Sequence, residues 1–169
     1  NRAAGSAWIG WTGLDAPIDR IVVTGGGQHA ILLSLMALAK PGDEILVEDF
    51  TYPGITDLAG HLHLRLRTVE LDREGIVPAS LDEACRTGSP AALYCISSFQ
   101  NPTAAFMSED RRQEIANVAV KHRLTVIEDD VFGFLAPDVK PLSSYLPEDQ
   151  IFYITSTSKS VAPGIRIGY

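Results

Sequence analysis

A lysine lies among hydroxyl and guanidinium side chains in the segment ITSTSKSVAPGIRIGY, residues 154–169. A lysine amine attacks a carbonyl carbon only when it is deprotonated, and nearby cations or loss of solvent lower its pKa toward that state. The hydroxyls of Ser156 and Ser158 and the guanidinium of Arg166 are donors suited to a phosphate. A single lysine is more often a solvated surface residue, but together these residues favour a nucleophilic Lys159 beside a bound phosphate.

Three consecutive glycines, Gly25 to Gly27, lead into an apolar segment in TGGGQHAILLSL, residues 24–35. Glycine lets the backbone approach a ligand closely, and the free amides at the start of a helix bind anions. The amides of Gly27 and Gln28 are therefore expected to bind a phosphate. The spacing matches neither of the common glycine-rich nucleotide motifs, which disfavours dinucleotide and P-loop binding. About as often, such glycines serve only the geometry of a turn.

Tyr52 and Asn101 each follow an expected strand. The ring of Tyr52 can stack on a planar ligand, which contributes about 0.5–1.5 kcal/mol beyond its area burial. Pro102 favours a turn or extended backbone at Asn101, whose amide can then donate to a ligand oxygen. Taken singly, each residue has a plainer explanation: Tyr52 as a packing residue and Asn101 as part of an ordinary turn.

Three successive acids, Glu128, Asp129 and Asp130, end another apolar segment. Alternate side chains of a strand point to opposite faces, so Glu128 and Asp130 are expected to point one way and Asp129 the other. A metal site is disfavoured because no histidine or cysteine stands nearby at a suitable spacing. A carboxylate here can instead keep a ring nitrogen protonated through a charge-assisted hydrogen bond.

The elements that must position these residues alternate along the chain. We expect strands at residues 20–24, 44–48, 62–71, 91–97, 124–130 and 150–156 and helices at Gln28–Ala39, Pro53–His61, Pro78–Arg86 and Ser108–His122. Ser108 is the expected N-cap of the last helix. Alternating strands and helices predict an α/β fold with a mostly parallel sheet and helices on both faces. The unusual residues follow the strands, at the sheet edge where ligands bind in such folds.

The composition narrows the functional classes. With 169 residues, 46% of them hydrophobic, the chain can form one core, so we expect a single domain over residues 1–169. A formal net charge of −7 argues against nucleic-acid binding by these residues. Cys85 and Cys95 lie in unlike contexts, which favours reduced thiols and a cytoplasmic location. Neither a membrane span nor a signal peptide is expected. The start at Asn1 suggests an excised piece of a longer protein.

Together these motifs resemble the large domain of fold-type I pyridoxal-phosphate enzymes, the class I/II aminotransferases. The resemblance runs along nearly the whole chain, and residues 156–168 match the family pattern S-x-S-K-x-x-x-P-G-x-R-x-G. It implies pyridoxal 5'-phosphate held as a Schiff base on Lys159, which would act in catalysis together with Asp129. It also implies further cofactor contacts: the phosphate with Gly27, Gln28, Ser156, Ser158 and Arg166, the ring face with Tyr52, the ring hydroxyl oxygen with Asn101, and the ring nitrogen with Asp129.

This sequence departs from the family pattern at Phe132. The family's D-x-x-Y motif ends in a tyrosine that hydrogen-bonds the ring hydroxyl oxygen, and phenylalanine lacks that donor. The resemblance further implies a small C-terminal domain that is absent here, homodimerisation of the full-length protein, and an amino acid or amine as ligand.

Two functional classes use this kind of domain. The sequence of residues 3–31, together with FTYPG and EDDVFG, resembles the effector-sensing domain of MocR-type transcription regulators. This resemblance implies that DNA is bound only through an N-terminal GntR-like domain not present here. The alternative is a free-standing aminotransferase that transfers an amino group between an amino acid and a 2-oxo acid. A nucleotide-binding module is disfavoured because it gives no common role to Lys159, Asn101 and Asp129.

Overall fold

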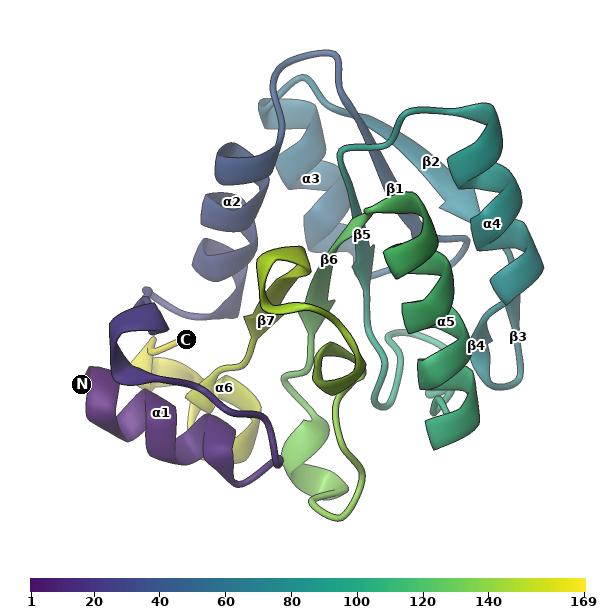
Figure 1. The fold of residues 1–169 in the computed structure, drawn as a ribbon. Helices are drawn as coiled ribbons and strands as arrows, with labels where there is room; N and C mark the ends of the chain where they lie inside the picture. The colour runs from purple at the N-terminus through teal and green to yellow at the C-terminus, as the bar shows by residue number, and fades with distance from the viewer.

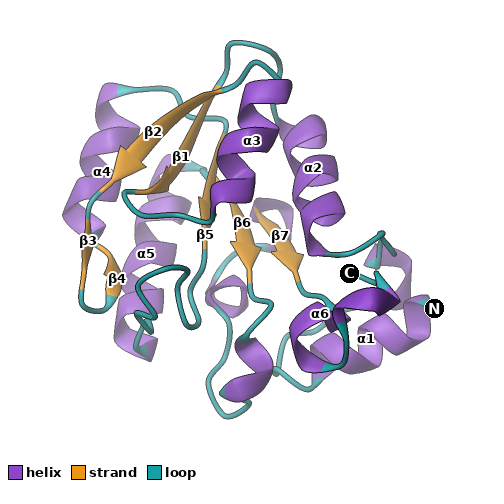
Figure 2. Ribbon diagram, turned by 180° about the vertical axis from the view of Figure 1, so that it is seen from behind, coloured by secondary structure: helices purple, strands orange, loops and turns teal.

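The fold is built on a five-stranded parallel sheet with strand order β2-β1-β5-β6-β7 (Figures 1 and 2). A computed structural model describes all residues, 1–169. Its strands are β1 (Glu44–Glu48), β2 (Arg65–Val69), β5 (Ala92–Cys95), β6 (Thr125–Asp129) and β7 (Ile151–Ile154), and every neighbouring pair is parallel. The predicted α/β class and the mostly parallel sheet are confirmed.

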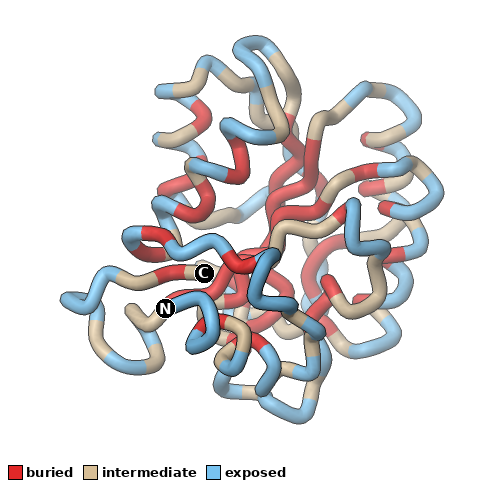
Figure 3. Tube along the Cα trace, turned by 60° about the vertical axis from the view of Figure 1, so that its left-hand side comes forward, coloured by how far each residue is buried: buried red, intermediate tan, exposed pale blue.

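Helices cover both faces of the sheet because its central strands are apolar on both sides. Along β1, Ile45 and Val47 pack beneath α2 (Gly27–Leu38) and α3 (Pro53–His61). Leu46, between them, faces the opposite layer of α4 (Pro78–Thr87) and α5 (Glu109–His122). Figure 3 shows the buried chain concentrated in these central strands. Because the strands are parallel, they all end at the same edge of the sheet. The residues that follow the strands therefore meet at that edge.

Helix α5 has the N-terminal cap that its sequence predicts. The Ser108 hydroxyl accepts a hydrogen bond from the Arg111 amide at 3.3 Å, and Glu109 and Asp110 lie in the first turn. Acidic residues there interact favourably with the helix dipole. The helix ends at His122, and the capping residue Arg123 that follows adopts the left-handed conformation with φ of 53°.

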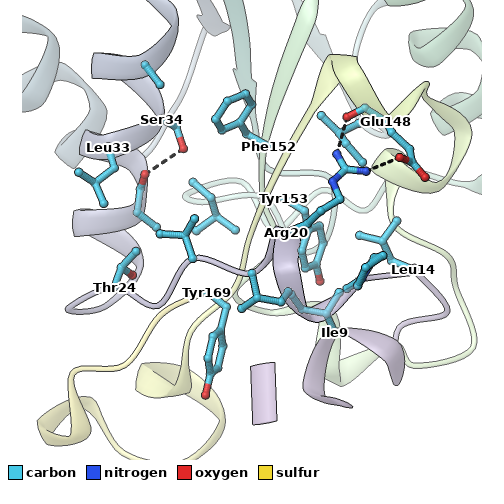
Figure 4. Close-up of a pocket in the computed structure, with 18 of the residues that line it drawn as sticks. Ile9, Leu14, Arg20, Thr24, Leu33, Ser34, Glu148, Phe152, Tyr153 and Tyr169 are labelled. Carbon is cyan, nitrogen blue, oxygen red and sulfur yellow. Dashed lines mark hydrogen bonds and ion pairs between the residues drawn. The ribbon is translucent and has the colours of Figure 1, made fainter. Parts of the chain in front are cut away.

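The expected strand at residues 20–24 is not formed. A strand needs a partner for its backbone groups, and only Thr24 finds one, exchanging hydrogen bonds of 2.8 and 3.1 Å with Gly168. A cleft of about 570 Å³ separates the rest of the segment from the free edge of β7. Figure 4 shows this cleft with Arg20 on one side, where it pairs with Glu148, and Phe152 on the other.

Several smaller elements were not expected from the sequence. These are α1 (Arg2–Gly10), α6 (Thr157–Ser160), the hairpin of β3 (Leu71–Asp72) and β4 (Gly75–Ile76), and short 3-10 helices at Ile18–Arg20, Gly133–Leu135, Leu142–Tyr145, Glu148–Gln150 and Pro163–Ile165. The strand expected over residues 62–71 shortens to β2, because it pairs with the five residues of β1 and then turns into the hairpin. None of the helices combines the length and the hydrophobicity that a membrane-spanning helix requires.

Candidate active site

A cavity of about 240 Å³ lies where the strands end at their carboxyl side. Tyr52 reaches it from the segment after β1, Asn101 from the loop after β5, and Asp129 from the last position of β6. The structure brings every predicted site residue to this one cavity. Its lining comprises Gly27, Gln28, Ile31, Tyr52, Ile96, Asn101, Asp129, Val131, Phe132, Ser156, Ser158, Lys159, Pro163 and Arg166.

One end of the cavity is rich in hydrogen-bond donors. Helix α2 begins at Gly27, and the amides of its first turn lack partners within the helix. The guanidinium of Arg166 lies over the turn before it and donates to the Gly25 carbonyl at 3.1 Å. Gly26 has a φ of 106°, and a Cβ there would come within 2.8 Å of Arg166 Nη2. Glycine at this position therefore lets the guanidinium lie against the helix N-terminus, where both can contact one anion.

The lysine and its serines follow β7 on the short helix α6. Ser156 is buried and precedes this helix in an extended conformation, whereas Lys159 is exposed. The Lys159 Nζ atom lies 5.9 Å from the centre of the Phe132 ring. The exposed amine of Lys159 is therefore accessible to a compound that enters the cavity.

Asp129 lines this cavity and has one buried carboxylate oxygen without a hydrogen-bond partner. Its Oδ2 accepts a hydrogen bond from the Tyr94 hydroxyl at 2.8 Å, whereas its buried Oδ1 has no partner. Burial raises the pKa of Asp129 to about 6, and the hydrogen bond from Tyr94 works in the opposite direction. A protonated ring nitrogen would supply the missing partner of Oδ1 and stabilise the charged carboxylate.

The two neighbouring acids of Asp129 do not line the cavity. Glu128 accepts hydrogen bonds from the amides of Leu142 and Ser143 at 2.8 and 2.7 Å. Asp130 accepts one from the Tyr153 hydroxyl at 2.9 Å. The predicted alternation of the three carboxylates is therefore present, with Asp129 alone facing the site. The chain holds no group of three or more histidine, cysteine, aspartate or glutamate side chains arranged to bind a metal ion.

Buried residues outside the cavity position two of its lining residues. The Tyr52 ring lies against the backbone of Gly54, where a Cβ would collide with it. Gln100, directly before Asn101, donates from Nε2 to Glu48 and to the Phe50 carbonyl and accepts from the Thr103 amide at 2.9 Å. Gln100 thus links the loop of Asn101 to the segment that leads to Tyr52.

The sequence analysis does not identify Tyr94, Gln100 or Gly54 as site residues. The sequence contexts of Tyr94 and Gln100 nevertheless indicate that their side chains need hydrogen-bond partners. A tyrosine within an apolar strand and a glutamine beside an expected turn each carry polar atoms that must find partners once they are buried. The identity of those partners depends on contacts between distant segments, which the sequence pattern alone does not give.

Comparison with known proteins places the chain in a family. Residues 8–169 match the family model for aminotransferase class I and II. The chain belongs to this family. Similar members include an uncharacterised HTH-type transcriptional regulator, YdeF, from Bacillus subtilis, which is 38% identical over 93% of this chain and 34% of its own length. The aminotransferase swnA of Arthroderma benhamiae is 35% identical over 87% of this chain and 36% of its own length.

Solved aminotransferase structures share the fold. An archaeal alanine:glyoxylate aminotransferase superposes with a TM-score of 0.89 at 28% identity, covering 99% of this chain and 44% of the other. The Pyrococcus horikoshii kynurenine aminotransferase, solved with PMP, gives a TM-score of 0.80 at 30% identity over 87% of this chain and 38% of its own. The chain thus spans about a third of the length of the curated relatives named above and less than half of these solved structures.

Proposed function

We propose that this aminotransferase-family domain binds pyridoxal 5'-phosphate and that Lys159 forms the covalent bond to its aldehyde. The supporting observation is the convergence of the phosphate donors, the aromatic ring, the Asp129 carboxylate and the lysine on one cavity. These residues come from segments far apart in the chain, and a shared ligand explains why they meet.

The residues present fit the cofactor. The amides of Gly27 and Gln28 with Ser156, Ser158 and Arg166 would hold the phosphate, and Tyr52 would pack on the ring. Asn101 would donate to the ring hydroxyl oxygen, and Asp129 Oδ1 would accept the ring N–H. When bound, the cofactor supplies a reactive aldehyde and a ring that withdraws electrons from the carbon attached to it.

The chemistry left to the protein is proton transfer and positioning. The amine of Lys159 would hold the cofactor through its aldehyde, and when free it would accept the proton from the Cα of an amino acid in the site. Asp129 would keep the ring nitrogen protonated, and the donors around Arg166 would hold the phosphate. Phe132 adds no hydrogen bond to the ring oxygen.

For the whole protein we propose a role as the effector-sensing part of a transcription regulator, in which an amino acid or amine reacts at this site. The support is the similarity to HTH-type regulators, 38% identical in YdeF and 34% in YisV of Bacillus subtilis, and the phenylalanine at position 132. The alternative, a free-standing aminotransferase, is favoured by the similarity to swnA and to solved aminotransferases.

Covalent trapping tests the cofactor assignment. Incubation with pyridoxal phosphate followed by borohydride should attach one cofactor to the wild-type protein, located by peptide mass spectrometry at Lys159. The Lys159→Ala variant should stay unlabelled. Lys140→Ala, which removes another exposed lysine, is the control and should label like the wild type. Labelling of Lys159→Ala to the same extent would refute the assignment.

A second experiment separates the regulator from the enzyme. With the full-length protein, a regulator should change its affinity for its own promoter DNA when pyridoxal phosphate and an amino acid are added, and it should form little 2-oxo acid. An enzyme should turn over a 2-oxo acid and an amino acid repeatedly without any effect of DNA. Steady turnover without DNA binding would refute the regulatory role.

A further inference from the structure

Two neighbouring aspartates at the end of β6 each accept a hydrogen bond from a tyrosine, one fully buried and one partly buried. Tyr94 on β5 donates to Asp129 at 2.8 Å, and Tyr153 on β7 donates to Asp130 at 2.9 Å. Both aspartates are buried, but only Asp129 lines the candidate cofactor cavity. Both pairs therefore contain the same kind of hydrogen bond, but only the pair of Asp129 adjoins the cavity.

The hydrogen bond from Tyr94 selects one orientation of the Asp129 carboxylate. Tyr94 is fully buried in the apolar layer beneath α2, and the carboxylate accepts its only side-chain hydrogen bond there. Rotating the carboxylate away would leave a buried hydroxyl without a partner, which is unfavourable. With Oδ2 held in this way, Oδ1 is the oxygen that remains free.

We propose that Tyr94 is a positioning residue that holds Asp129 with Oδ1 directed at the ring nitrogen of the cofactor; this inference rests on the proposed function. Tyr94 does not line the cavity and acts only through Asp129. Its donor also favours the ionised carboxylate, the form that pairs with a protonated ring nitrogen. Burial and the neighbouring Glu128 raise the pKa of Asp129 and so oppose the ionised form. The hydrogen bond from Tyr94 counteracts part of this rise in pKa.

Tyr94→Phe removes the hydroxyl and keeps the ring, and Tyr153→Phe is the matched control. Dissociation constants would be measured by absorbance titration with pyridoxal phosphate and with a carbocyclic analogue in which carbon replaces the ring nitrogen. Loss of a hydrogen bond to a charged group should raise the constant of Tyr94→Phe for pyridoxal phosphate about tenfold. The analogue should bind this variant and the wild type alike, and Tyr153→Phe should match the wild type with both ligands.

The outcomes separate the inference from the function on which it rests. Equal affinities of the two variants for pyridoxal phosphate would overturn the role of Tyr94 alone. Absence of binding by the wild-type protein would overturn the proposed function and this inference with it. If Tyr94→Phe does not fold, 3-fluorotyrosine at position 94 replaces it. A more acidic donor strengthens the hydrogen bond to Asp129, so it should lower the constant for pyridoxal phosphate and leave the analogue unaffected; no change for either ligand would contradict the proposal.

Discussion

The Nζ atom of Lys159 lies 5.9 Å from the centre of the Phe132 ring, on the wall of the cavity that also holds Asp129. A hydroxyl added to this ring would introduce a donor into the site. We expect Phe132→Tyr to bind pyridoxal phosphate about tenfold more tightly, because a hydrogen bond to a charged oxygen contributes about 1.5–3 kcal/mol. Absorbance titration measures this change. Phe132→Leu adds no hydroxyl and should not tighten binding; equal tightening by both variants would exclude a hydrogen bond as the cause.

Gly54 controls where the Tyr52 ring lies, because a Cβ at position 54 would collide with it. In Gly54→Ala the ring must move, and the stacking energy of about 0.5–1.5 kcal/mol is lost. Cofactor affinity should fall about two- to tenfold. The control is Gly60→Ala in the same helix, where a Cβ meets nothing within 4 Å; alanine there should leave affinity unchanged and stabilise α3. A loss of affinity in both variants would point to the helix rather than to Tyr52.

The sequence predicts the site better than it predicts the edge of the sheet. The cofactor-lining residues follow strands whose apolar runs are clear, and parallel strands bring such positions together wherever the exact boundaries fall. The segment 20–24 carries the same apolar signal but forms no strand, because only Thr24 reaches a pairing partner, Gly168. Local pattern thus indicates what a segment is able to form, whereas its neighbours in space decide whether it does so.

The supporting residues of the site were beyond prediction for a related reason. Tyr94 and Asp129 are separated by 35 positions, and Gln100 and Glu48 by 52. Each pair depends on the strand order β1-β5-β6 and on which strand faces carry polar atoms. Alternation placed Asp129 on the opposite face from its neighbours, but no rule of spacing identifies the hydroxyl that meets it.

Arg112 is a fully buried cation of α5 that contacts the segment after β5 and the end of β6. It donates to the Met107 and Ser97 carbonyls at 3.0 and 3.1 Å and lies 3.8 Å from the equally buried Glu128. Arg112→Met should cost about 3–5 kcal/mol in free energy of unfolding, because it leaves a buried carboxylate without its cation. Lys121→Met breaks an exposed pair with Asp82 and should cost far less, because exposed ion pairs contribute little to stability. Urea denaturation measures both, and equal costs would contradict the importance of burial.

Glu48 gives the stability of the fold a distinct dependence on pH. It is fully buried beside Gln100, and burial raises its pKa from 4.5 to about 8. Between these values the folded protein keeps a proton that the unfolded chain releases, so Glu48 lowers the free energy of unfolding as the pH rises from about 5 to 8. Gln cannot ionise and preserves an acceptor for Gln100. We expect Glu48→Gln to gain about 1 kcal/mol or more over the wild type at pH 8 relative to pH 5.

The comparison isolates Glu48 because the other buried acids are common to both proteins. Burial raises the pKa of Asp129 and of Asp130 to about 6 as well, so both proteins should lose stability over this range, the wild type more steeply. Glu70→Gln removes an exposed carboxyl and should follow the wild-type curve. Denaturation curves at pH 5, 6, 7 and 8 give the slopes. Parallel slopes for the wild type and Glu48→Gln would show that the buried glutamate is charged in the folded protein across the whole range, and that Gln100 binds a carboxylate instead of a neutral acid.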